Sequence, residues 1–363
     1  MTTMPWVVPF SVADVPSASA LDPYLESLRG GAAVSTGGSP GVDRFERRLA
    51  ERFGWEHVVA VSSGTTGLRL VLGALGLSGD ILVPGLGFPA TFQAATAAGL
   101  RLVQCDIEAV NLGMCVDFAR RRVDEQTAAV LAVHQFGRPC DARGLAALEL
   151  ERDLVVVFDA AAAVGQRLNG VPVASFGRAS VFSFHWSKPL SCMEGGAVVT
   201  QDSELAAELR KLRNFGLDGG RPPDLRGENG KLSDVSAALG LVSLDRFDDR
   251  FRRRRECHGL YTELLGDVDG LHLLEEPSSG LPPTATVVFE DASAAATVRS
   301  MAARGVQCRA YGGQRFRPPR SGPLPVLDRL ADRLLSLPLY PSMTEDQVRT
   351  VCVSLLGALA HGA

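Results

Sequence analysis

Two residues, Lys188 and Asp159, have the types and the positions that could do chemistry. The chain contains only three lysines, Lys188, Lys211 and Lys231, and otherwise relies on arginine for positive charge. Lysine, unlike arginine, loses its proton when it is desolvated and then acts as an amine nucleophile. Asp159 ends the apolar run LVVVFD, and the carboxyl end of a buried strand is where α/β enzymes place working groups. We interpret Lys188 as a Schiff-base lysine and Asp159 as the partner of a pyridine nitrogen, which is the chemistry of pyridoxal phosphate.

Each of these residues also has a plainer interpretation. Asp159 could cap a helix that begins in the following run AAAAVG, although an idle charge beside a buried strand is costly. Lys188 could be a surface lysine whose stem lies along apolar surface. Aromatic residues precede Lys188 and the Gly-Gly start of a strand follows it, which favours a functional position.

The segment SSGTTG, residues 62–67, is a candidate phosphate site because it follows a strand pattern and opens a helix pattern. Unpaired amides at the N-terminus of a helix, with hydroxyls and glycine nearby, bind phosphate. A plain Ser/Thr helix cap is the alternative. The hydroxyl of Ser183, five residues before Lys188, could add a hydrogen bond to the same phosphate.

Phe88, His185 and Asn229 carry weaker signals. Phe88 lies in the strand-to-helix turn PGLGFPAT and could stack on a flat ring, although a place in the core is the commoner use of phenylalanine. His185 lies between Ser183 and Lys188, where a structural histidine is equally consistent with the pattern. Asn229 occupies a glycine-rich loop before a capped helix, which by itself indicates only a turn.

Alternating strand and helix patterns must position these groups. Apolar runs of strand length, such as 80–85, 128–137 and 154–159, alternate with helical segments such as 88–99 and 141–152. Continuous apolar strands that alternate with helices are typical of a mostly parallel sheet covered by helices on both faces. The sequence therefore predicts an α/β protein.

The pattern changes in the last third of the chain. We expect Asp43 to cap a helix, and a strongly helical stretch over 232–265 to link two domains. A shorter α+β unit follows. The predicted division is a large cofactor-binding domain with an N-terminal arm, 1–250, and a small C-terminal domain, 251–363.

The composition describes an ordinary globular chain of 363 residues with 46% apolar and 21% charged residues. A net charge of −4 gives no electrostatic basis for binding nucleic acid, and we interpret the basic run 252–255 as a solvated helix face or a subunit contact. The seven cysteines form no CxxC pair, so we expect no metal site and free thiols in a reducing compartment. No signal-peptide pattern and no membrane-length apolar run is visible, so we expect a cytoplasmic protein without membrane contact.

Together these segments resemble the DegT/StrS-type sugar aminotransferase family, within the fold-type I pyridoxal-phosphate enzymes. The resemblance covers nearly the whole chain. Its most specific segment is SFGRASVFSFHWSKPLSCMEGGAVVT, around Lys188, which is similar to the catalytic-lysine signature of the family. Other segments match in the same order: STGGSPGVDRFERRLAERFG, VSSGTTGLRL, VHQFGRPCDARGL, GENGKLSDVSAALGL and LLSLPLYPSMTEDQV.

The resemblance implies a large domain with a mostly parallel seven-stranded sheet and a smaller C-terminal α+β domain. It implies pyridoxal 5′-phosphate as cofactor and a homodimer whose active sites lie at the subunit interface. The implied reaction moves an amino group from an amino acid, commonly L-glutamate, to a keto sugar. The form FSFHxxKxxxxxEGG is most similar to members that act on nucleotide-linked 4-keto-6-deoxy sugars, in pathways to secondary metabolites or surface glycans.

The resemblance also implies a role for each site residue. Lys188 carries the cofactor as an internal aldimine and then moves the proton, Asp159 pairs with the pyridinium, and Phe88 stacks on the ring. The implied phosphate ligands are Gly64, Thr65, Thr66 and Ser183, with Asn229 contributed by the neighbouring subunit. The candidate substrate contacts are His185, Arg213, Arg309 and the arginines between 315 and 320.

Ala162 departs from the family pattern, which has Gln or His three positions after the aspartate, near the ring oxygen of the cofactor. The small side chain implies a larger pocket beside the ring and a changed proton affinity. Elimination or carbon–carbon bond formation on the same scaffold therefore stays open. Two further alternatives are transfer to a keto-cyclitol, on which some family members act, and a cofactor-binding regulatory protein without turnover. The presence of Lys188, Asp159 and Ser183 favours an enzyme over the regulatory protein.

Overall fold

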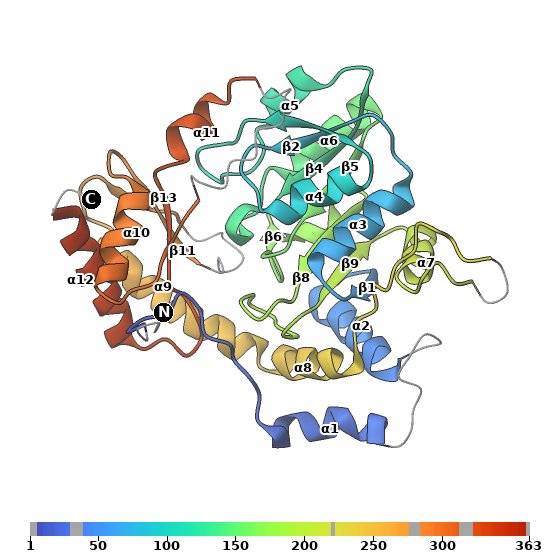
Figure 1. The fold of residues 1–363 in the computed structure, drawn as a ribbon, viewed down its shortest axis with the longest axis horizontal. Helices are drawn as coiled ribbons and strands as arrows, with labels where there is room; N and C mark the ends of the chain where they lie inside the picture. The colour runs from blue at the N-terminus through green and yellow to red at the C-terminus, as the bar shows by residue number, and fades with distance from the viewer. Residues whose placement is uncertain (1–5, 30–38, 219–221, 276–283, 312–321, 361–363) are drawn as a thin grey trace.

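A seven-stranded sheet forms the centre of the larger part of the molecule, with the strand order β1-β9-β8-β5-β4-β2-β3 (Figure 1). The computed structural model describes residues 6–29, 39–218, 222–275, 284–311 and 322–360. Strands β2, β3, β4, β5 and β8 run parallel, and β9 runs antiparallel to both of its neighbours. The predicted α/β class with a mostly parallel sheet is confirmed. The strands are β1 His57–Val61, β2 Asp80–Pro84, β3 Arg101–Cys105, β4 Thr127–Val133, β5 Val155–Asp159, β8 Ala179–Ser183 and β9 Gly196–Thr200.

Helices cover both faces of this sheet, as the continuous apolar strands predict. Successive residues of β5 show the alternation: Val157 packs under one layer of helices, whereas Val156 and Phe158 pack under the other. The layer over Val157 consists of α3 Gly64–Leu75, α4 Pro89–Ala97 and α7 Ser203–Leu212. The opposite layer consists of α2 Pro40–Phe53, α5 Val116–Arg122, α6 Ala142–Arg152 and α8 Asp234–Asp245.

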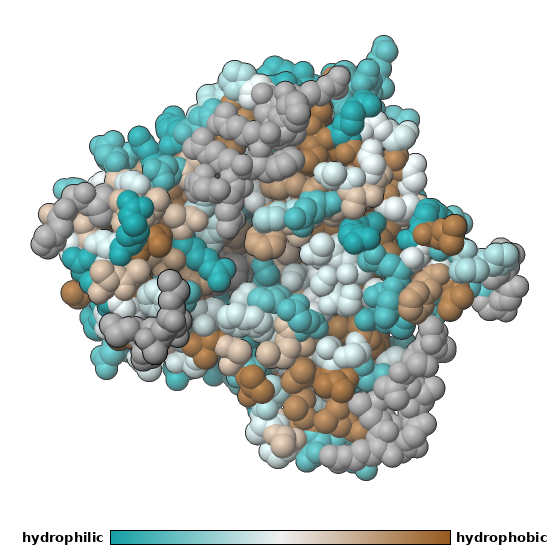
Figure 2. Space-filling view, viewed as in Figure 1, coloured by the Kyte–Doolittle hydropathy of each residue, from teal (hydrophilic) through white to brown (hydrophobic). Residues whose placement is uncertain are grey.

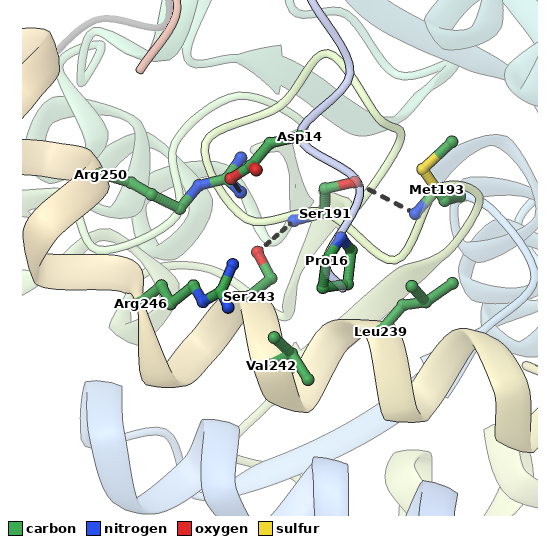
Figure 3. A pocket seen from close by; sticks show the side chains of 9 residues that line it. All are labelled: Asp14, Pro16, Ser191, Met193, Leu239, Val242, Ser243, Arg246 and Arg250. Atoms are coloured by element: carbon green, nitrogen blue, oxygen red, sulfur yellow. Dashed lines mark hydrogen bonds and ion pairs between the residues drawn. The ribbon is translucent and has the colours of Figure 1, made fainter. Parts of the chain in front are cut away.

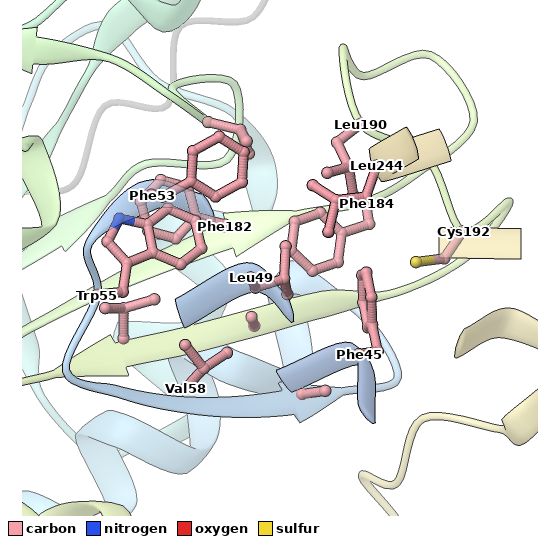
Figure 4. Packing of buried hydrophobic residues seen from close by; sticks show 14 of the residues in the cluster. Phe45, Leu49, Phe53, Trp55, Val58, Phe182, Phe184, Leu190, Cys192 and Leu244 are labelled. Atoms are coloured by element: carbon pink, nitrogen blue, oxygen red, sulfur yellow. The ribbon is translucent and has the colours of Figure 1, made fainter. Parts of the chain in front are cut away.

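An aromatic cluster fixes β8, the strand that leads to Lys188 (Figure 4). Trp55 stacks on Phe182 with ring centroids 4.5 Å apart, and Phe45 meets Phe184 edge to face at 5.6 Å. Both phenylalanines of the β8 segment are fully buried. Closely packed aromatic rings can shift little without loss of contact. This cluster therefore sets the direction of the chain that follows β8.

A second sheet lies in the C-terminal part of the chain, with the order β10-β11-β13-β12 and antiparallel pairing throughout. Its core is separate from that of the large sheet and includes Val287, Leu335 and Leu337. The elements are α9 Phe247–Leu265, β10 Leu271–Leu273, β11 Ala285–Phe289, α10 Ala294–Ala303, β12 Arg309–Ala310, α11 Pro325–Leu330, β13 Leu334–Leu337 and α12 Glu345–Ala360.

The N-terminal segment runs as an arm along α9, from the small sheet to the large one (Figure 1). Val8 forms a parallel bridge with Val306, and further on α1, Ala18–Arg29, lies beside α8. Figure 2 shows apolar side chains gathered where α1 and α8 lie at the lower edge of the view. The remaining short elements are β6 Arg167–Leu168 and β7 Val171–Pro172, with single 3-10 turns at Gln135–Gly137 and Val173–Ser175.

Two local predictions are wrong. Ser39, not Asp43, caps α2: its side chain accepts from the Val42 amide, and Pro40 occupies the first helical position. The helical stretch 232–265 is two helices, because Arg246 leaves helical geometry at φ −97° and ψ 7° between α8 and α9. The segment that carries β12 pairs with β13 at residues 309 and 310 and with the N-terminal arm at Val306.

Candidate active site

Asp159 lies where the sequence predicts, at the carboxyl end of a central strand, and its side chain is buried. Its Oδ2 accepts a hydrogen bond from Thr91 Oγ1 at 2.7 Å, and its Oδ1 accepts one from the Ala161 amide at 3.1 Å. Burial raises the pKa of Asp159, while the two hydrogen bonds and the nearby charge of Lys188 act to lower it. The result is an oriented buried carboxyl group that a cationic partner would ionise.

Lys188 follows β8 in a tight turn, in which its amide donates to the carbonyl of His185 at 2.9 Å. Burial lowers the pKa of Lys188, the charge of Asp159 raises it, and the charge of Arg309 lowers it. Desolvation therefore moves this amine toward its neutral, nucleophilic form, as its sequence neighbours suggest. Lys188 and Asp159 act on one another electrostatically, so the structure brings the two predicted reactive groups together.

The start of α3 forms a cradle beside these two groups. Ser63 caps the helix by accepting from the Thr66 amide at 3.1 Å, and within the described residues the amides of Gly64 and Thr65 make no hydrogen bond. A Cβ placed on Gly64 would lie 3.1 Å from the Cβ of Ser183. The predicted phosphate residues of the two segments are therefore neighbours, with free amides at a helix N-terminus.

The helix-cap and phosphate-site interpretations of SSGTTG both apply. Ser63 is the cap, and the hydroxyl of Thr66 lies 3.1 Å from that of Ser62 and 3.0 Å from that of Ser63. The Ser62 amide donates to the carbonyl of Gly230 at 2.8 Å. The cap thus engages the amide of Thr66. The first two amides of α3, those of Gly64 and Thr65, are left for an anion.

Phe88 lies directly before α4 and its side chain is 66% exposed, which argues against a role in the core. Ala162 is half-buried in the turn after β5, where the Ala163 amide donates to the carbonyl of Ala160 at 2.8 Å. A methyl group at Ala162 offers no hydrogen bond to a ligand. His185 is half-buried, and burial lowers its pKa while the charge of Glu194 raises it.

The side chains of Asn229 and Arg213 each have hydrogen-bond partners within their own chain. The side chain of Asn229 is exposed and accepts from Lys231 Nζ at 2.6 Å. The guanidinium of Arg213 donates to Glu46 at 2.5 Å and to the carbonyl of Ala60 at 2.7 Å, which gives it a structural role at the start of the large sheet. The predicted contacts between residues 315 and 320 lie outside the described residues.

The small sheet contributes Arg309, whose charge acts on both Lys188 and His185. Two residues further, Tyr311 meets Phe136 edge to face with centroids 4.7 Å apart. Phe136 follows β4, the neighbour of β5, and has a left-handed φ of 53°. These contacts place one end of the small sheet at the same edge of the large sheet as Asp159.

Sequence reasoning missed Thr91, Phe136 and Tyr311. Thr91 is fully buried and holds Asp159 from a helix 68 residues earlier in the chain. Its only sequence signal is its place in PGLGFPAT, the turn that also contains Phe88. Phe136 and Tyr311 belong to segments whose contact depends on how the two sheets meet, for which the sequence carries no periodic signal.

Residues that line a small cleft beside the turn of Lys188 hold that turn in place through hydrogen bonds (Figure 3). The Ser191 amide donates to Ser243 Oγ at 3.0 Å, and the Met193 amide donates to Ser191 Oγ at 3.1 Å. Met193 has a left-handed φ of 65°. From the arm, Asp14 reaches across the cleft to an ion pair with Arg250.

Two classes of feature are absent from the described residues. No group of three or more His, Cys, Asp or Glu side chains there could hold a metal ion. Within the same residues no helix is long and apolar enough to cross a membrane.

Comparison with known proteins gives consistent matches. The model of the DegT/DnrJ/EryC1/StrS aminotransferase family matches residues 20–356. The chain is 31% identical to a dTDP-4-dehydro-2,3,6-trideoxy-D-glucose 4-aminotransferase of Saccharopolyspora spinosa, over 89% of this chain and 90% of the relative. It is 31% identical to a dTDP-4-amino-4,6-dideoxy-D-glucose transaminase of Shigella dysenteriae, over 72% of this chain and 71% of the relative. The crystal structure of DesI with its TDP-sugar product superposes with a TM-score of 0.90 at 35% identity, over 98% of this chain and 93% of DesI.

Proposed function

The chain belongs to the DegT/DnrJ/EryC1/StrS aminotransferase family, and we propose that it moves an amino group from L-glutamate to a nucleotide-linked 4-keto-6-deoxy sugar. Its cofactor is pyridoxal 5′-phosphate. The observation that carries the proposal is the meeting of Lys188 and Asp159 beside the open amides of α3. The printed names of the two relatives, both transaminases of dTDP-linked sugars, support the substrate class.

The described residues fit this cofactor. The amides of Gly64 and Thr65 are suited to bind an anion, and Ser183 lies next to Gly64 at the same helix start. Asp159 is a buried carboxyl group held by two donors, which suits a protonated ring nitrogen better than water. Phe88 is exposed at this edge of the sheet and is free to cover one face of a ring. A phosphate, a pyridine nitrogen and an aldehyde thus each have a matching group.

When bound, pyridoxal 5′-phosphate supplies an electron sink for the carbanion left by an α-proton. Asp159 keeps the proton on the ring nitrogen, because its carboxylate offsets the positive charge there. Lys188 Nζ takes a proton from the amino-bearing carbon and returns one to the neighbouring position, which a neutral amine with a lowered pKa can do. Thr91 fixes the Asp159 carboxylate in the orientation that this contact needs.

Substrate contacts follow from what surrounds Lys188. Arg309 is exposed and, within the described residues, pairs with no carboxylate, so its charge is available to an anionic group of the substrate. His185 lies in the turn of Lys188 and can donate to or accept from a sugar hydroxyl. Arg213 is the weakest of the predicted contacts, because Glu46 and Ala60 already engage its guanidinium.

We also propose a division of the chain near residue 250, and a homodimer. The division follows from the separate cores of the two sheets and from α9, which runs between them. The dimer is supported by exposed apolar side chains at Val12, Val15, Phe215 and Leu217, which a second copy would cover. In that dimer, the exposed Asn229 would reach the neighbouring phosphate site.

The test uses the purified holoenzyme with L-glutamate and dTDP-4-dehydro-6-deoxyglucose. We expect glutamate alone to bleach the visible band of the cofactor, and the sugar nucleotide to restore it with formation of an amino sugar. A keto-cyclitol as the better acceptor would change the substrate class. A band that no amino donor bleaches would contradict the proposed transamination.

A further inference from the structure

The N-terminal arm is attached to the small sheet at the strand that carries Arg309. Val8 is fully buried and forms a parallel bridge with Val306. The Gln307 amide donates to the carbonyl of Val8 at 2.9 Å, and the Phe10 amide donates to Gln307 Oε1 at 2.9 Å. The arm thus adds backbone pairing to this edge, and the position of Phe10 is fixed relative to Gln307.

Alternate residues of this segment face opposite ways, as a period of two requires. Val306 and Cys308 are buried in the core of the small sheet. On the other side, Gln307 bonds the arm and Arg309 places its guanidinium over the ring of Phe10, 4.2 Å from the ring centroid. Tyr311, next in the same series, meets Phe136 of the large sheet. Arg309 therefore lies between the arm and the active-site edge.

The ring of Phe10 is the support of that guanidinium. Phe10 is only 6% exposed, whereas the side chain of Arg309 is exposed and pairs with no acid among the described residues. A long arginine side chain in solvent samples many rotamers, and a planar aromatic face beneath it favours one orientation. Without the ring of Phe10, the guanidinium of Arg309 would sample more positions near the site.

We propose that Phe10 is a positioning residue, whose ring holds Arg309 where it binds an anionic group of the substrate. The inference rests on the proposed function, since it names a residue of the arm that serves that site. The shared chemistry is an anion recognised by a guanidinium, which is either the carboxylate of the amino donor or the phosphates of the sugar nucleotide. Phe10 acts through Arg309 and does not touch the substrate.

The variants Phe10→Leu and Phe10→Tyr, each alone and with Arg309→Met, test the proposal in the holoenzyme. Calorimetry measures the binding of succinate, which carries carboxylates, and of dTDP, which carries phosphates. We expect Phe10→Leu to weaken one of the two by roughly three- to tenfold, to raise the corresponding KM and to leave kcat nearly unchanged. Phe10→Tyr keeps the aromatic face and should bind as the parent does. In the Arg309→Met background, Phe10→Leu should add nothing.

Phe289→Leu is the matched control, because Phe289 is also a buried phenylalanine, lies in the core of the small sheet, and has no ring contact with Arg309. It should lower Tm as Phe10→Leu does and leave both binding constants alone. The proposal is overturned if Phe10→Leu changes neither ligand, if it acts equally with Arg309→Met, or if Phe289→Leu reproduces its effect. Failure of the wild-type enzyme to transaminate would instead refute the proposed function, since ligand binding is measured without turnover.

Discussion

The hydroxyl of Thr91, in the first turn of α4, donates to Asp159 Oδ2 at the end of β5 at 2.7 Å. Both side chains are buried, and the two residues are 68 positions apart in the chain. This bond joins the helix that follows Phe88 to the carboxylate that we assign to the ring nitrogen. The bond orients the Asp159 carboxylate, whose other hydrogen bond, from the Ala161 amide, is longer at 3.1 Å.

Thr91→Val should therefore impair catalysis without removing any group that reacts. A hydrogen bond to a charged group contributes about 1.5–3 kcal/mol, so we expect kcat to fall by roughly ten- to a hundredfold. Thr91→Ser keeps the donor and should restore most of the rate. Steady-state kinetics of both variants provide the measurement, and a loss in Thr91→Ser as large as that in Thr91→Val would contradict the role assigned to the hydroxyl.

Ser183 provides a test of the phosphate cradle. Ser183→Ala should weaken the binding of pyridoxal 5′-phosphate by about tenfold, the equivalent of one charge-assisted hydrogen bond. The control is Ser180→Ala in the same strand, because Ser180 lies on the other face of the sheet and its buried hydroxyl has no partner among the described residues. Fluorescence titration of the apoenzyme gives both dissociation constants, and unchanged affinity in Ser183→Ala would remove this serine from the cradle.

The pH dependence of cofactor attachment should depend on Arg309. Attachment needs the neutral amine of Lys188, whose pKa is lowered by burial, raised by Asp159 and lowered by Arg309. Removing the charge in Arg309→Gln raises that pKa, so the rate of apoenzyme reconstitution should rise at a higher pH than in the wild type. Asp159→Asn removes the opposing charge and should shift the profile to lower pH.

Arg309→Lys is the control for this profile, because it keeps a positive charge in the same segment. Its reconstitution should follow the wild-type pH dependence. His185 also faces Lys188, and its own pKa is lowered by burial, so His185→Gln is measured beside it. A shift to lower pH in Arg309→Gln would contradict the assigned direction.

Mixed dimers test whether Asn229 serves the neighbouring site. Asn229→Ala chains retain Lys188 and Lys188→Ala chains retain Asn229, so a mixed dimer would contain one complete site. Refolding an equal mixture should recover roughly a quarter of the wild-type activity when subunits pair at random. Activity no higher than the mean of the two parents would place Asn229 in its own subunit's site or in none.

The order of the elements and the positions of Lys188 and Asp159 could be predicted because their signals are local. Apolar runs and the helices between them specify a parallel sheet, and the end of LVVVFD is then necessarily at its carboxyl edge. The start of α3 could also be predicted, because SSGTTG combines a helix cap with small residues at the end of a strand.

The wrong or missing predictions concern features that the local sequence does not mark uniquely. Both Ser39 and Asp43 can cap a helix, and Pro40 at the first helical position decides for Ser39. The break at Arg246 has no Gly or Pro to mark it. Strand β13 was missed because its four residues are adjacent to Pro338 and give no long apolar run. The roles of Thr91, Phe10 and Tyr311 depend on tertiary contacts, which periodicity does not encode.

The central claim, that Lys188 is the residue to which the cofactor attaches, can be tested in a protein with one lysine. Lys211 and Lys231 are the other two lysines of the chain. Arginine can keep the ion pairs of Lys211 with two carboxylates and the hydrogen bond of Lys231. The variant Lys211→Arg/Lys231→Arg should retain the visible band, bleach with L-glutamate, and after borohydride reduction carry the cofactor on Lys188 alone. Lys188→Ala should lose the label and at least roughly a hundredfold of activity. A single-lysine chain without label on Lys188, or a Lys188→Ala chain that still turns over glutamate, would contradict the account.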